Sequence, residues 1–597
     1  MNKWLDWGSI FGVIILLLYP AMAQEKLVGE GIDLYGTVWF YGWIKFCLEN
    51  GVDPSFTDWF FYPSGKDIFA HTGNNFVDAL ISVTFQWLFG TPRYYSFFIA
   101  SIFLSNVWGL RVVLGKWKLS PMQIWFLCML WLMNPFILSE MTMGRPTQCL
   151  LLPAFLAIAV FIDLHQQSVA PLKNACKMGV FVALQGWIYW YYGYFLAFGL
   201  LLVVLGRWWH LCRRNILQEL RLYLIAIAMC LLCIFPAIWK MIHLLQRGAI
   251  PGILIDKSGS FSDISEQMVH WVRGYQLNEI LGHPMFASMI WGLVLLLGLF
   301  SAVFKYNRPL LWVLFMYFLL AMGPVIVLSE NLEILNIPYL LLVKFLPFWS
   351  RLWFPYRMLS GIFVVLILII AGVLKNWGEH RQSLLGCLGL FTVGIGLFEN
   401  HQIGTFPIPT TSWNQNSVIN MIDEPIIELP IGFAKSTMMW QVLHQQPTFG
   451  GMGENLSIFA SPNYQNRLSN PFIRFLTVMT TQPHNSIVYA PLDRKRIEDL
   501  GFVYLSLNRQ MVELELNKHL DNFTTLVEVE DQLILTFGYP LAMENEIWLW
   551  NLQQPIWIEP PNFQNNRQNH QYLLNPYSDY EQKLQNLGRL PKFATEN

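Results

Sequence analysis

Charged residues are scarce in this sequence. Of its 597 residues, 13% are Asp, Glu, Lys or Arg, whereas 54% are hydrophobic and 16% are aromatic. Because soluble globular domains carry about 25% charged residues, this composition excludes a wholly soluble protein and predicts a polytopic α-helical membrane protein embedded in the lipid bilayer. An excess of positive charge is also absent, since the formal net charge is −1. Nucleic acid is therefore excluded as a partner, because its phosphates require a basic surface.

Cysteines with metal-binding or disulfide spacing are missing as well. The 8 cysteines are scattered and none follows Cys387, so we expect no disulfide to hold the C-terminal region together. Cys230 and Cys233 lie in an apolar run, which favours packing in the membrane over zinc or redox chemistry. The chain also lacks a Walker A motif, a Rossmann glycine fingerprint, a G-x-S-x-G elbow and an H-E-x-x-H sequence. These absences remove the common signatures of nucleotide binding, serine hydrolysis and zinc proteolysis.

Long apolar runs are present instead, and they predict about eleven transmembrane helices. The runs lie at 8–20, 94–114, 121–139, 148–164, 178–206, 220–243, 286–304, 309–328, 356–375 and 383–398. The run at 178–206 is interrupted at Tyr191-Tyr-Gly193, and we interpret it as two short crossings. A single crossing would place Arg207, Arg213 and Arg214 outside, against the positive-inside rule.

Lys and Arg are distributed in agreement with a cytoplasmic N-terminus. The short loops assigned to the cytoplasm are rich in basic residues, among them Lys116, Lys173 and Arg308. The long connections then all fall on the exoplasmic side, where we expect the functional site. These connections are 24–93, 244–285, 329–355 and the region after 399.

The first apolar run has two interpretations. Lys3, the run itself and the small residues Ala21 and Ala23 fit a cleavable signal peptide. The same residues fit a first transmembrane helix, and we favour this interpretation because a retained helix would fix the following segment against the bilayer. Sequencing the N-terminus of the mature protein separates the two.

The first exoplasmic loop, 24–93, is acidic and rich in aromatic residues. Within it, residues 37–48 have apolar side chains at helical spacing, which predicts a helix lying in the membrane interface. Trp39 and Trp43 are expected at the depth of the lipid headgroups, where tryptophan is enriched.

The composition changes after Phe398. The region 399–559 is rich in Pro, Asn and Gln and contains short β-like runs, which predict an exoplasmic α+β domain of roughly 150 residues. The β-like runs are 426–429, 502–507, 524–529 and 532–537. The residues before this region, 1–398, are interpreted as a transmembrane module, and residues 560–597 as a polar tail.

A stretch with two carboxylates follows the first apolar run, Gly29-Glu-Gly-Ile-Asp-Leu-Tyr-Gly36. In a helix, Glu30 and Asp33 would share one face at the membrane boundary, where partial desolvation raises the basicity of a carboxylate. The alternative is a pair of solvated loop acids.

Arginines, a further carboxylate and tyrosines are brought to the same exoplasmic rim by the predicted topology. They are Glu140, Arg145, Tyr191, Tyr192, Arg351 and Arg357. This mixture suits a phosphate at headgroup depth, because arginine binds phosphate bidentately while a carboxylate can take a proton from an attacking hydroxyl. Interfacial anchoring is the alternative for the last two arginines. Solvation is favoured over a role for His270 and Arg273.

Short motifs in this order resemble the GT-C superfamily of integral-membrane glycosyltransferases, and in particular bacterial members of uncharacterised specificity. The motifs are Gly29-Glu-Gly-Ile-Asp33, Thr57-Asp-Trp-Phe-Phe-Tyr-Pro-Ser-Gly65, Gly144-Arg-Pro-Thr-Gln148, Tyr191-Tyr-Gly193, Leu346-Pro-Phe-Trp-Ser-Arg351 and Pro355-Tyr-Arg357. The resemblance covers approximately the first two thirds of the chain.

The resemblance implies an enzyme that moves a sugar from a polyprenyl-phosphate donor to the hydroxyl of an unknown acceptor. The implied location is the bacterial inner membrane, with the N-terminus in the cytoplasm and the C-terminal domain in the periplasm. The implied site residues are Asp33 as general base, Glu30 and Glu140 as supporting polar groups, Arg145, Arg351 and Arg357 at the donor phosphate, and Tyr191 and Tyr192 in the cavity wall.

One departure from the family pattern leaves metal dependence open. The second outer loop has no Asp-x-Asp or Glu-x-Asp, and Glu140 is its only acid. A divalent cation such as Mg²⁺ or Mn²⁺ requires oxygen ligands. Carboxylates that could join Asp33 in such a site are Asp53, Asp58, Asp67 and Asp78.

Two other functions compete with glycosyl transfer. A transporter or flippase for lipid-linked sugars is disfavoured, because the charged residues of the predicted helices lie near their ends and leave the membrane midplane without an acid or base. A non-catalytic scaffold whose outer domain binds a partner would tolerate the loss of Asp33.

Overall fold

The computed structural model describes residues 3–68, 75–166, 170–208, 216–246, 257–269, 288–300, 308–329, 332–346, 349–352, 354–375, 382–413, 417–431, 437–450, 463–464, 467, 470–481, 501–517, 525–544 and 546–556. The chain packs into two compact units. Unit 1 comprises residues 1–37 and 72–413, and unit 2 comprises residues 38–71 and 414–597. The polar tail predicted at 560–597 lies outside the described residues.

Unit 1 is helical. Its helices are α1 (Lys3–Gln24), the start of α2 (Ile32–Asn50), α3 (Phe76–Phe89), α4 (Arg93–Lys116), α5 (Pro121–Leu132), α6 (Pro135–Thr142), η1 (Pro146–Gln148), α7 (Leu152–His165), α8 (Pro171–Ile188), α9 (Trp190–Trp208), α10 (Ile216–Gln246), α11 (Phe261–Val269), α14 (Met289–Phe300), α15 (Arg308–Ala321), α16 (Ile337–Phe345), η3 (Trp349–Arg351), η4 (Pro355–Met358), α17 (Leu359–Leu374) and α18 (Gln382–Gln402). Its short strands are β1 (Leu27–Val28), β4 (Val325–Ser329), β5 (Leu332–Leu335) and β6 (Thr410–Thr411).

Seven helical spans among the described residues are long and apolar enough to cross a membrane. They are Trp4–Gln24, Arg93–Lys116, Pro121–Thr142, Pro146–His165, Glu219–Leu244, Pro355–Leu374 and Ser383–Gln402. Three shorter apolar helices are Phe76–Phe89, Trp190–Gly206 and Arg308–Ala321. The protein is therefore a polytopic α-helical membrane protein, as predicted from its composition. The count of about eleven crossings stays a prediction.

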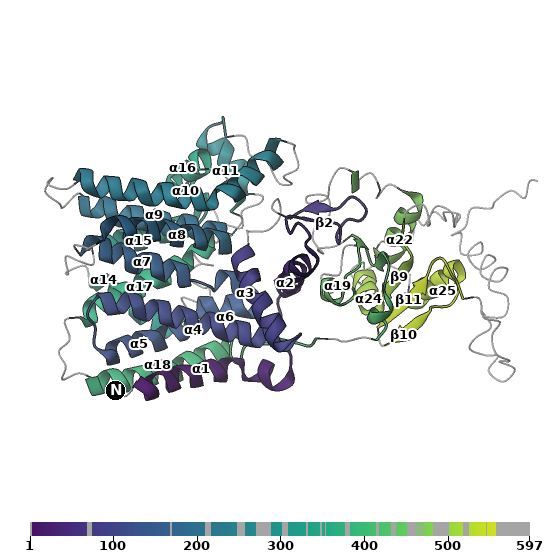
Figure 1. Ribbon diagram of the computed structural model, residues 1–597, viewed down its shortest axis with the longest axis horizontal. Helices are drawn as coiled ribbons and strands as arrows, with labels where there is room; N and C mark the ends of the chain where they lie inside the picture. The colour runs from purple at the N-terminus through teal and green to yellow at the C-terminus, as the bar shows by residue number, and fades with distance from the viewer. Residues whose placement is uncertain are drawn as a thin grey trace, which may run out of the picture. The chain divides into compact units, whose positions relative to one another are not determined.

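Many helices of unit 1 run roughly parallel to one another (Figure 1). Burial differs strongly between its spans. The span Pro355–Leu374, which contains α17, is 83% buried, whereas the span Glu219–Leu244 in α10 is only 11% buried. α10 packs against α8, which in turn packs against α7. The outward face of α10 carries apolar side chains such as Leu224, Leu231 and Phe235. An apolar helix that is exposed on one side suits contact with lipid.

α1 is joined to the bundle by polar contacts inside an apolar span. Arg111 of α4 makes two hydrogen bonds to the carboxylate of Asp6, at 2.9 and 2.5 Å, and Asp6 is buried. Trp125 of α5 donates its indole N–H to Ser9 Oγ at 2.9 Å. These contacts agree with the interpretation of the first apolar run as a transmembrane helix.

The chain breaks its helix between α8 and α9. Tyr189 has an extended backbone, with φ −153° and ψ 115°, and α9 begins at the next residue. The sequence predicted an interruption at Tyr191-Tyr-Gly193, two residues later. The resulting helices contain 18 and 19 residues, so each is about 27 Å long.

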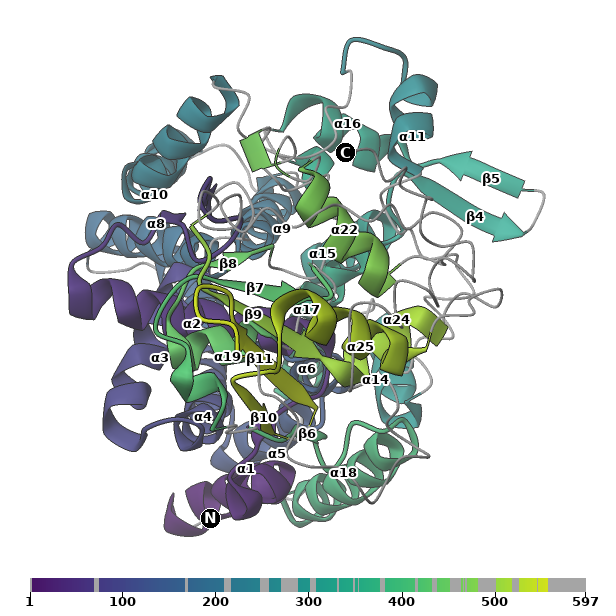
Figure 2. The same ribbon diagram turned by 90° about the vertical axis from the view of Figure 1, so that its right-hand side faces the viewer.

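Unit 2 is an α+β unit with a mixed sheet in the order β10-β11-β9-β7-β8 (Figure 2). β7 is parallel to both β8 and β9, whereas β11 is antiparallel to β9 and to β10. One hydrophobic cluster contains Ile426, Tyr504 and Leu549. The elements of unit 2, apart from the end of α2, are β2 (Phe56–Thr57), β3 (Lys66–Asp67), η6 (Ile419–Met421), β7 (Ile426–Leu429), α19 (Thr437–His444), β8 (Thr448–Phe449), α22 (Pro471–Thr481), β9 (Tyr504–Asn508), α24 (Arg509–Asn517), α25 (Leu526–Phe537), β10 (Ala542–Glu544) and β11 (Ile547–Asn551).

The strand predictions for unit 2 are half correct. The run 426–429 coincides with β7, and the run 502–507 overlaps β9. The strands predicted at 524–529 and 532–537 are wrong, because residues 526–529 and 532–537 belong to α25. Thr525 and Glu528 form a capping box that starts this helix. Its buried apolar residues are Val529, Leu533 and Phe537, which lie four apart.

Residues from the first loop complete unit 2. Gln441 of α19 accepts the indole N–H of Trp39 at 2.7 Å and donates to Trp59 O at 2.5 Å. Trp39 and Trp43 are 3% and 1% exposed, and their rings stack at 6.0 Å. The prediction that these two tryptophans lie among lipid headgroups is therefore wrong. The residues 38–50 are helical, as predicted, but they bury their indoles against α19 and the segment around Trp59.

Candidate active site

The segment that carries Asp33 is fixed by its backbone. β1 pairs antiparallel with β6, and Gly29 donates its N–H to Pro409 O at 2.6 Å and accepts from Thr411 Oγ1 at 2.8 Å. On its other side, Glu30 N donates to Thr142 O at 2.9 Å. The start of α2 is thus held between the end of α6 and the strand that follows α18.

Two glycines allow the start of α2 to approach the turn after α6. A Cβ atom on Gly31 would lie 2.4 Å from Met143 O. A Cβ atom on Gly144, whose φ is +74°, would lie 2.4 Å from Leu34 Cβ. Both distances exclude a larger residue, and the positive φ adds a second reason at Gly144. Asp33, in the first turn of α2, therefore lies beside the Glu140–Arg145 turn.

Arg145 joins two carboxylates. Its Nε donates to Asp33 Oδ2 at 2.6 Å, and its Nη1 donates to Glu140 Oε2 at 3.4 Å and to Tyr356 Oη at 3.1 Å. The side chain of Arg145 is 13% exposed and that of Asp33 is 34% exposed. Asp33 is thus accessible from one side, while the guanidinium that holds it is mostly covered.

Glu140 is buried and surrounded by hydrogen-bond donors. Besides Arg145, it receives a hydrogen bond from Tyr356 Oη at 3.4 Å to its Oε1. With its amide oxygen toward Arg357, Gln148 donates its amide N–H to Glu140 Oε2 and accepts from Arg357 Nη2 at 3.2 Å. Gln148 therefore connects the Glu140–Arg145 turn to Arg357.

Arg357, at the start of the α17 span, is held by aromatic groups. Its Nη1 donates to Tyr189 Oη at the break between α8 and α9. Its guanidinium lies 4.7 Å from the ring centre of Phe354 and 5.4 Å from that of Tyr189, distances typical of cation–π contacts. Its Nε is buried and has no hydrogen-bond partner among the described residues. This geometry fixes the plane of the guanidinium and leaves one donor uncommitted.

The charges of this network balance. Two arginines, Arg145 and Arg357, face two carboxylates, Asp33 and Glu140. Burial by itself lowers the pKa of Arg145, but the neighbouring carboxylates Glu140 and Asp33 outweigh burial and raise this pKa above its usual value. Arg145 is therefore a permanent cation between the two carboxylates.

The structure brings together four of the residues that the sequence placed at the site: Asp33, Glu140, Arg145 and Arg357. Glu30 precedes α2 instead of sharing a helical face with Asp33, and its side chain is exposed. Arg351 is the last residue of η3, but its side chain lies outside the described residues. His270 and Arg273 also lie outside them.

Three members of the network, Gln148, Tyr189 and Tyr356, were not singled out from the sequence. Gln148 and Tyr356 belong to motifs in which only the arginine was assigned a role. Tyr189 begins the Tyr-Trp-Tyr-Tyr run that was noted for its later residues. In the sequence, each of these is a polar residue next to an arginine or within an aromatic cluster. That pattern does not identify a hydrogen-bond partner far away in the chain.

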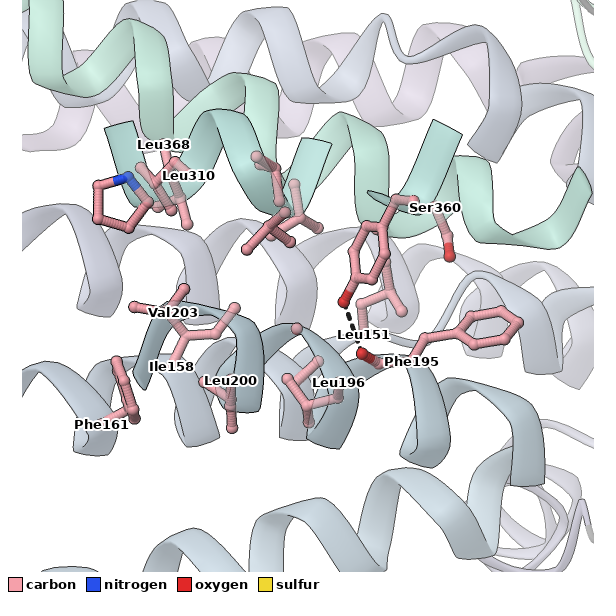
Figure 3. A pocket seen from close by; sticks show the side chains of 18 of the residues that line it. Leu151, Ile158, Phe161, Phe195, Leu196, Leu200, Val203, Leu310, Ser360 and Leu368 are labelled. Atoms are coloured by element: carbon pink, nitrogen blue, oxygen red, sulfur yellow. Dashed lines mark hydrogen bonds between the residues drawn. The ribbon is translucent and has the colours of Figure 1, made fainter. Parts of the chain in front are cut away.

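An apolar cavity of about 470 Å³ lies among the helices next to this network (Figure 3). Tyr192 and Ser360 line its polar end, and Ser360 Oγ donates to Arg357 O at 2.9 Å. From there the wall is formed by apolar side chains of α7, α9, α15 and α17, including Leu196, Leu200 and Leu368. Tyr191 does not belong to this wall. Tyr192 and Gly206, both in the wall, are fourteen residues apart on α9, so the cavity follows that helix for about 21 Å.

The described residues contain no group of three or more His, Cys, Asp or Glu side chains that could hold a metal ion. Asp78, a candidate ligand in the sequence, is buried and accepts a hydrogen bond from Thr147 at 2.8 Å. Asp53 accepts from both the N–H and the hydroxyl of Ser55. Asp53, Asp58 and Asp67 belong to unit 2, whereas Asp33 belongs to unit 1.

Neither protein-family models nor curated sequences match the chain. Solved structures do. Over 92% of its length the chain is similar to arabinofuranosyltransferase AftD from Mycobacteria, with 14% identity and a TM-score of 0.54, and it spans 42% of that longer protein. Weaker likenesses are an oligosaccharyltransferase from Archaeoglobus fulgidus (11% identity, TM-score 0.45, 89% of this chain and 73% of that one) and ArnT from Cupriavidus metallidurans (12%, 0.40, 92% and 98%). The similarity to AftD establishes the architecture: the chain is a polytopic membrane protein with the GT-C fold of integral-membrane glycosyltransferases.

Proposed function

We propose that the protein transfers a sugar from a polyprenyl-phosphate donor to an acceptor hydroxyl on the exoplasmic side of a bacterial inner membrane. The observation that carries this proposal is the junction of two features in unit 1. An apolar cavity within the helices ends at Ser360 and Tyr192, and the network of Arg357, Arg145, Glu140 and Asp33 begins there. A long apolar chain with a phosphate at one end matches this combination.

The cavity accounts for the lipid part of the donor. Its wall is apolar along about 21 Å of α9, which suits an extended isoprenoid chain, since apolar surface is stabilised by removal from water. Gly199 and Gly361 make room for Tyr317, whose hydroxyl donates to Phe195 O at 2.5 Å, so this hydroxyl is satisfied within the wall. In this proposal the isoprenoid chain of the donor lies beside α9, and the phosphate of the donor reaches Arg357.

The arginines account for the phosphate. Arg357 is pre-oriented by Tyr189, Gln148 and Phe354, and its Nε–H is available to an anion. Pre-orientation matters because a guanidinium that is already fixed loses little side-chain entropy when phosphate binds. Arg351, at the end of η3, and Arg145 complete the proposed phosphate-binding set.

Asp33 accounts for the acceptor. Its carboxylate is paired with Arg145 and one-third exposed, so an acceptor hydroxyl can reach it. In the transfer step the hydroxyl oxygen bonds to the anomeric carbon, the bond from that carbon to the phosphate oxygen breaks, and its electron pair stays on the polyprenyl phosphate. Asp33 takes the hydroxyl proton, as a general base does. Glu140 orients Arg145 from the opposite side, and Glu30 is left as a group at the entrance.

Filling the cavity tests the proposal directly. Leu200 lines the cavity, whereas its neighbour Leu201 is exposed on the outside of α9. We expect Leu200→Trp to abolish transfer from a long-chain polyprenyl-phosphate sugar by purified full-length protein, because the added ring occupies the volume of the lipid. Leu201→Trp is the matched control and should keep wild-type activity. Equal activity of the two variants, with wild-type yield, would remove the lipid from this cavity.

A further inference from the structure

Arg145 lies between two carboxylates, a position that a divalent cation often occupies in other proteins. Its Nε and Nη1 bond to Asp33 and Glu140, the two carboxylates of the proposed site, at 2.6 and 3.4 Å. Two carboxylates that face each other across a site repel unless a positive charge lies between them. In many sites that charge is a metal ion. Here it belongs to a side chain.

The groups around Glu140 are hydrogen-bond donors and do not suit a metal site. Arg145 and Gln148 present N–H groups to Glu140 Oε2, and Tyr356 presents its hydroxyl hydrogen to Oε1. A hard cation such as Mg²⁺ or Mn²⁺ needs oxygen lone pairs from several ligands at once. The described residues around Asp33 and Glu140 offer no third carboxylate or imidazole. The residues present therefore do not fit a divalent ion.

We propose that Arg145 is the resident cation of this site and replaces a divalent metal ion between Asp33 and Glu140. This inference rests on the proposed glycosyl transfer for its meaning. In that reaction negative charge accumulates on the polyprenyl phosphate as the anomeric carbon leaves it. Arg145 lies beside the base and supplies a fixed positive charge for the phosphate while it orients Asp33, and it moves no proton itself. Transfer then needs no added metal.

Manganese binding tests this replacement without an assay of activity. Full-length wild-type protein in detergent is mixed with Mn²⁺ and the bound ion is measured by electron paramagnetic resonance. We expect no bound Mn²⁺ in the wild type and about one per chain in Arg145→Ala at roughly millimolar Mn²⁺, because this variant removes the positive charge between the two carboxylates. Arg145→Ala combined with Glu140→Gln should bind none. Arg93→Ala is the matched control, because it removes an arginine from an exposed pair with Glu25 and should create no site.

Transfer assays add a second readout. We expect EDTA to leave wild-type transfer unchanged. Arg145→Ala should reduce the transfer rate about a hundredfold. Added Mn²⁺ should then raise the rate of this variant about tenfold, because the ion partly replaces the charge of the guanidinium.

Two results would overturn the proposal. One is Mn²⁺ bound to the wild type that Glu140→Gln removes, and the other is no binding by folded Arg145→Ala or Arg145→Gln. If neither variant folds, the wild-type measurement decides by itself. A protein that transfers no sugar from any polyprenyl-phosphate donor would refute the proposed function, while the manganese measurements would still decide the role of Arg145.

Discussion

Glu30 and Asp33 are three positions apart in the sequence but have different surroundings. Asp33 is paired with Arg145, whereas Glu30 is exposed and its side chain has no hydrogen-bond partner among the described residues. We expect Asp33→Asn to reduce transfer at least about a hundredfold, the usual effect of losing a general base. Glu30→Gln should stay close to wild type. Initial rates of both purified variants on a polyprenyl-phosphate sugar measure the difference, and wild-type transfer by Asp33→Asn would contradict the catalytic role.

A substitution at Arg357 can test separately whether its charge or its planar geometry is needed. Arg357→Lys keeps the positive charge but loses the planar fork that contacts Gln148 and Tyr189. A charge-assisted hydrogen bond is worth about 1.5–3 kcal/mol, so the KM for the lipid donor should rise at least about tenfold. Arg351→Ala should also raise this KM. If both variants lower detergent stability and leave the donor KM unchanged, these arginines are interfacial anchors.

The polar residues of the site could be predicted only where a motif marked them. Asp33, Arg145 and Arg357 could be placed together because the predicted topology brings their segments to one rim of the membrane, while their proposed roles came from the family resemblance. Tyr189 and Gln148 could not, because each acts through a hydrogen bond to Arg357, which is more than 160 positions away. A contact of that kind depends on how the spans pack. Hydrophobic periodicity shows which face of a helix is apolar, but it does not show which other helix packs against that face.

The ion pair between α1 and α4 makes the first helix part of the bundle. Asp6 and Arg111 are bonded through two hydrogen bonds, and the side chain of Asp6 is 4% exposed. Removing one partner of a buried pair typically costs about 3–5 kcal/mol, because the other charge is left unpaired. We therefore expect Asp6→Ala to lower the Tm in detergent by several degrees. Asp6→Leu combined with Arg111→Met should recover most of it, whereas a double variant as unstable as the single one would contradict this account.

Two buried groups give unit 2 a pH-dependent stability. Burial raises the pKa of Glu428 in β7 to about 8, although a hydrogen bond from Thr437 acts in the opposite direction. Burial lowers the pKa of His444 in α19 to about 3. The folded unit thus holds Glu428 protonated and His444 neutral at pH 7. In the unfolded chain Glu428 ionises above about pH 4.3 and His444 is charged below about pH 6.5.

The sign of the effect follows from these proton counts. Between about pH 6.5 and 8 only the unfolded chain has lost the Glu428 proton, so the stability of unit 2 falls by up to a few kcal/mol as pH rises. Between about pH 4.3 and 6.5 the two groups act in opposite directions and nearly cancel. We expect hydrogen exchange of β7 amides in the full-length protein, corrected for intrinsic rate, to speed up from pH 6.5 to 8. Glu428→Gln should remove this dependence, and the same slope in that variant would exclude Glu428 as its source.

The errors of secondary-structure prediction in unit 2 have a local cause. The β-branched and aromatic residues at 524–537 favour strands when short windows are considered. The capping box of Thr525 and Glu528, together with apolar residues four apart, favours one continuous helix. β7 and β9 were predicted correctly because all four residues of β7 and all five of β9 are buried, as expected for inner strands of a sheet.

Composition and charge distribution were enough to predict the membrane class of the whole molecule. They also predict its orientation: the basic short loops should keep the N-terminus in the cytoplasm and place the region after Glu399 outside. We expect alkaline phosphatase fused after Glu399 to be active in a bacterial host, and a fluorescent protein that folds only in the cytoplasm to be dark at the same position. The opposite pattern would place Asp33 on the cytoplasmic side and exclude an exoplasmic donor site.

The pairing of β1 with β6 links the site to the order in which the chain is made. Gly29, four residues before Asp33, bonds to Pro409 and Thr411, which follow the last span. The first span precedes Gly29, and a ribosome translates the other six spans between these two segments. Asp33, the proposed base, therefore acquires its final support only after the seven described spans have been synthesised. A chain arrested earlier can insert its helices, yet it lacks the strand that holds Asp33, so a nascent or truncated protein would not consume lipid-linked sugar before the whole module is in place.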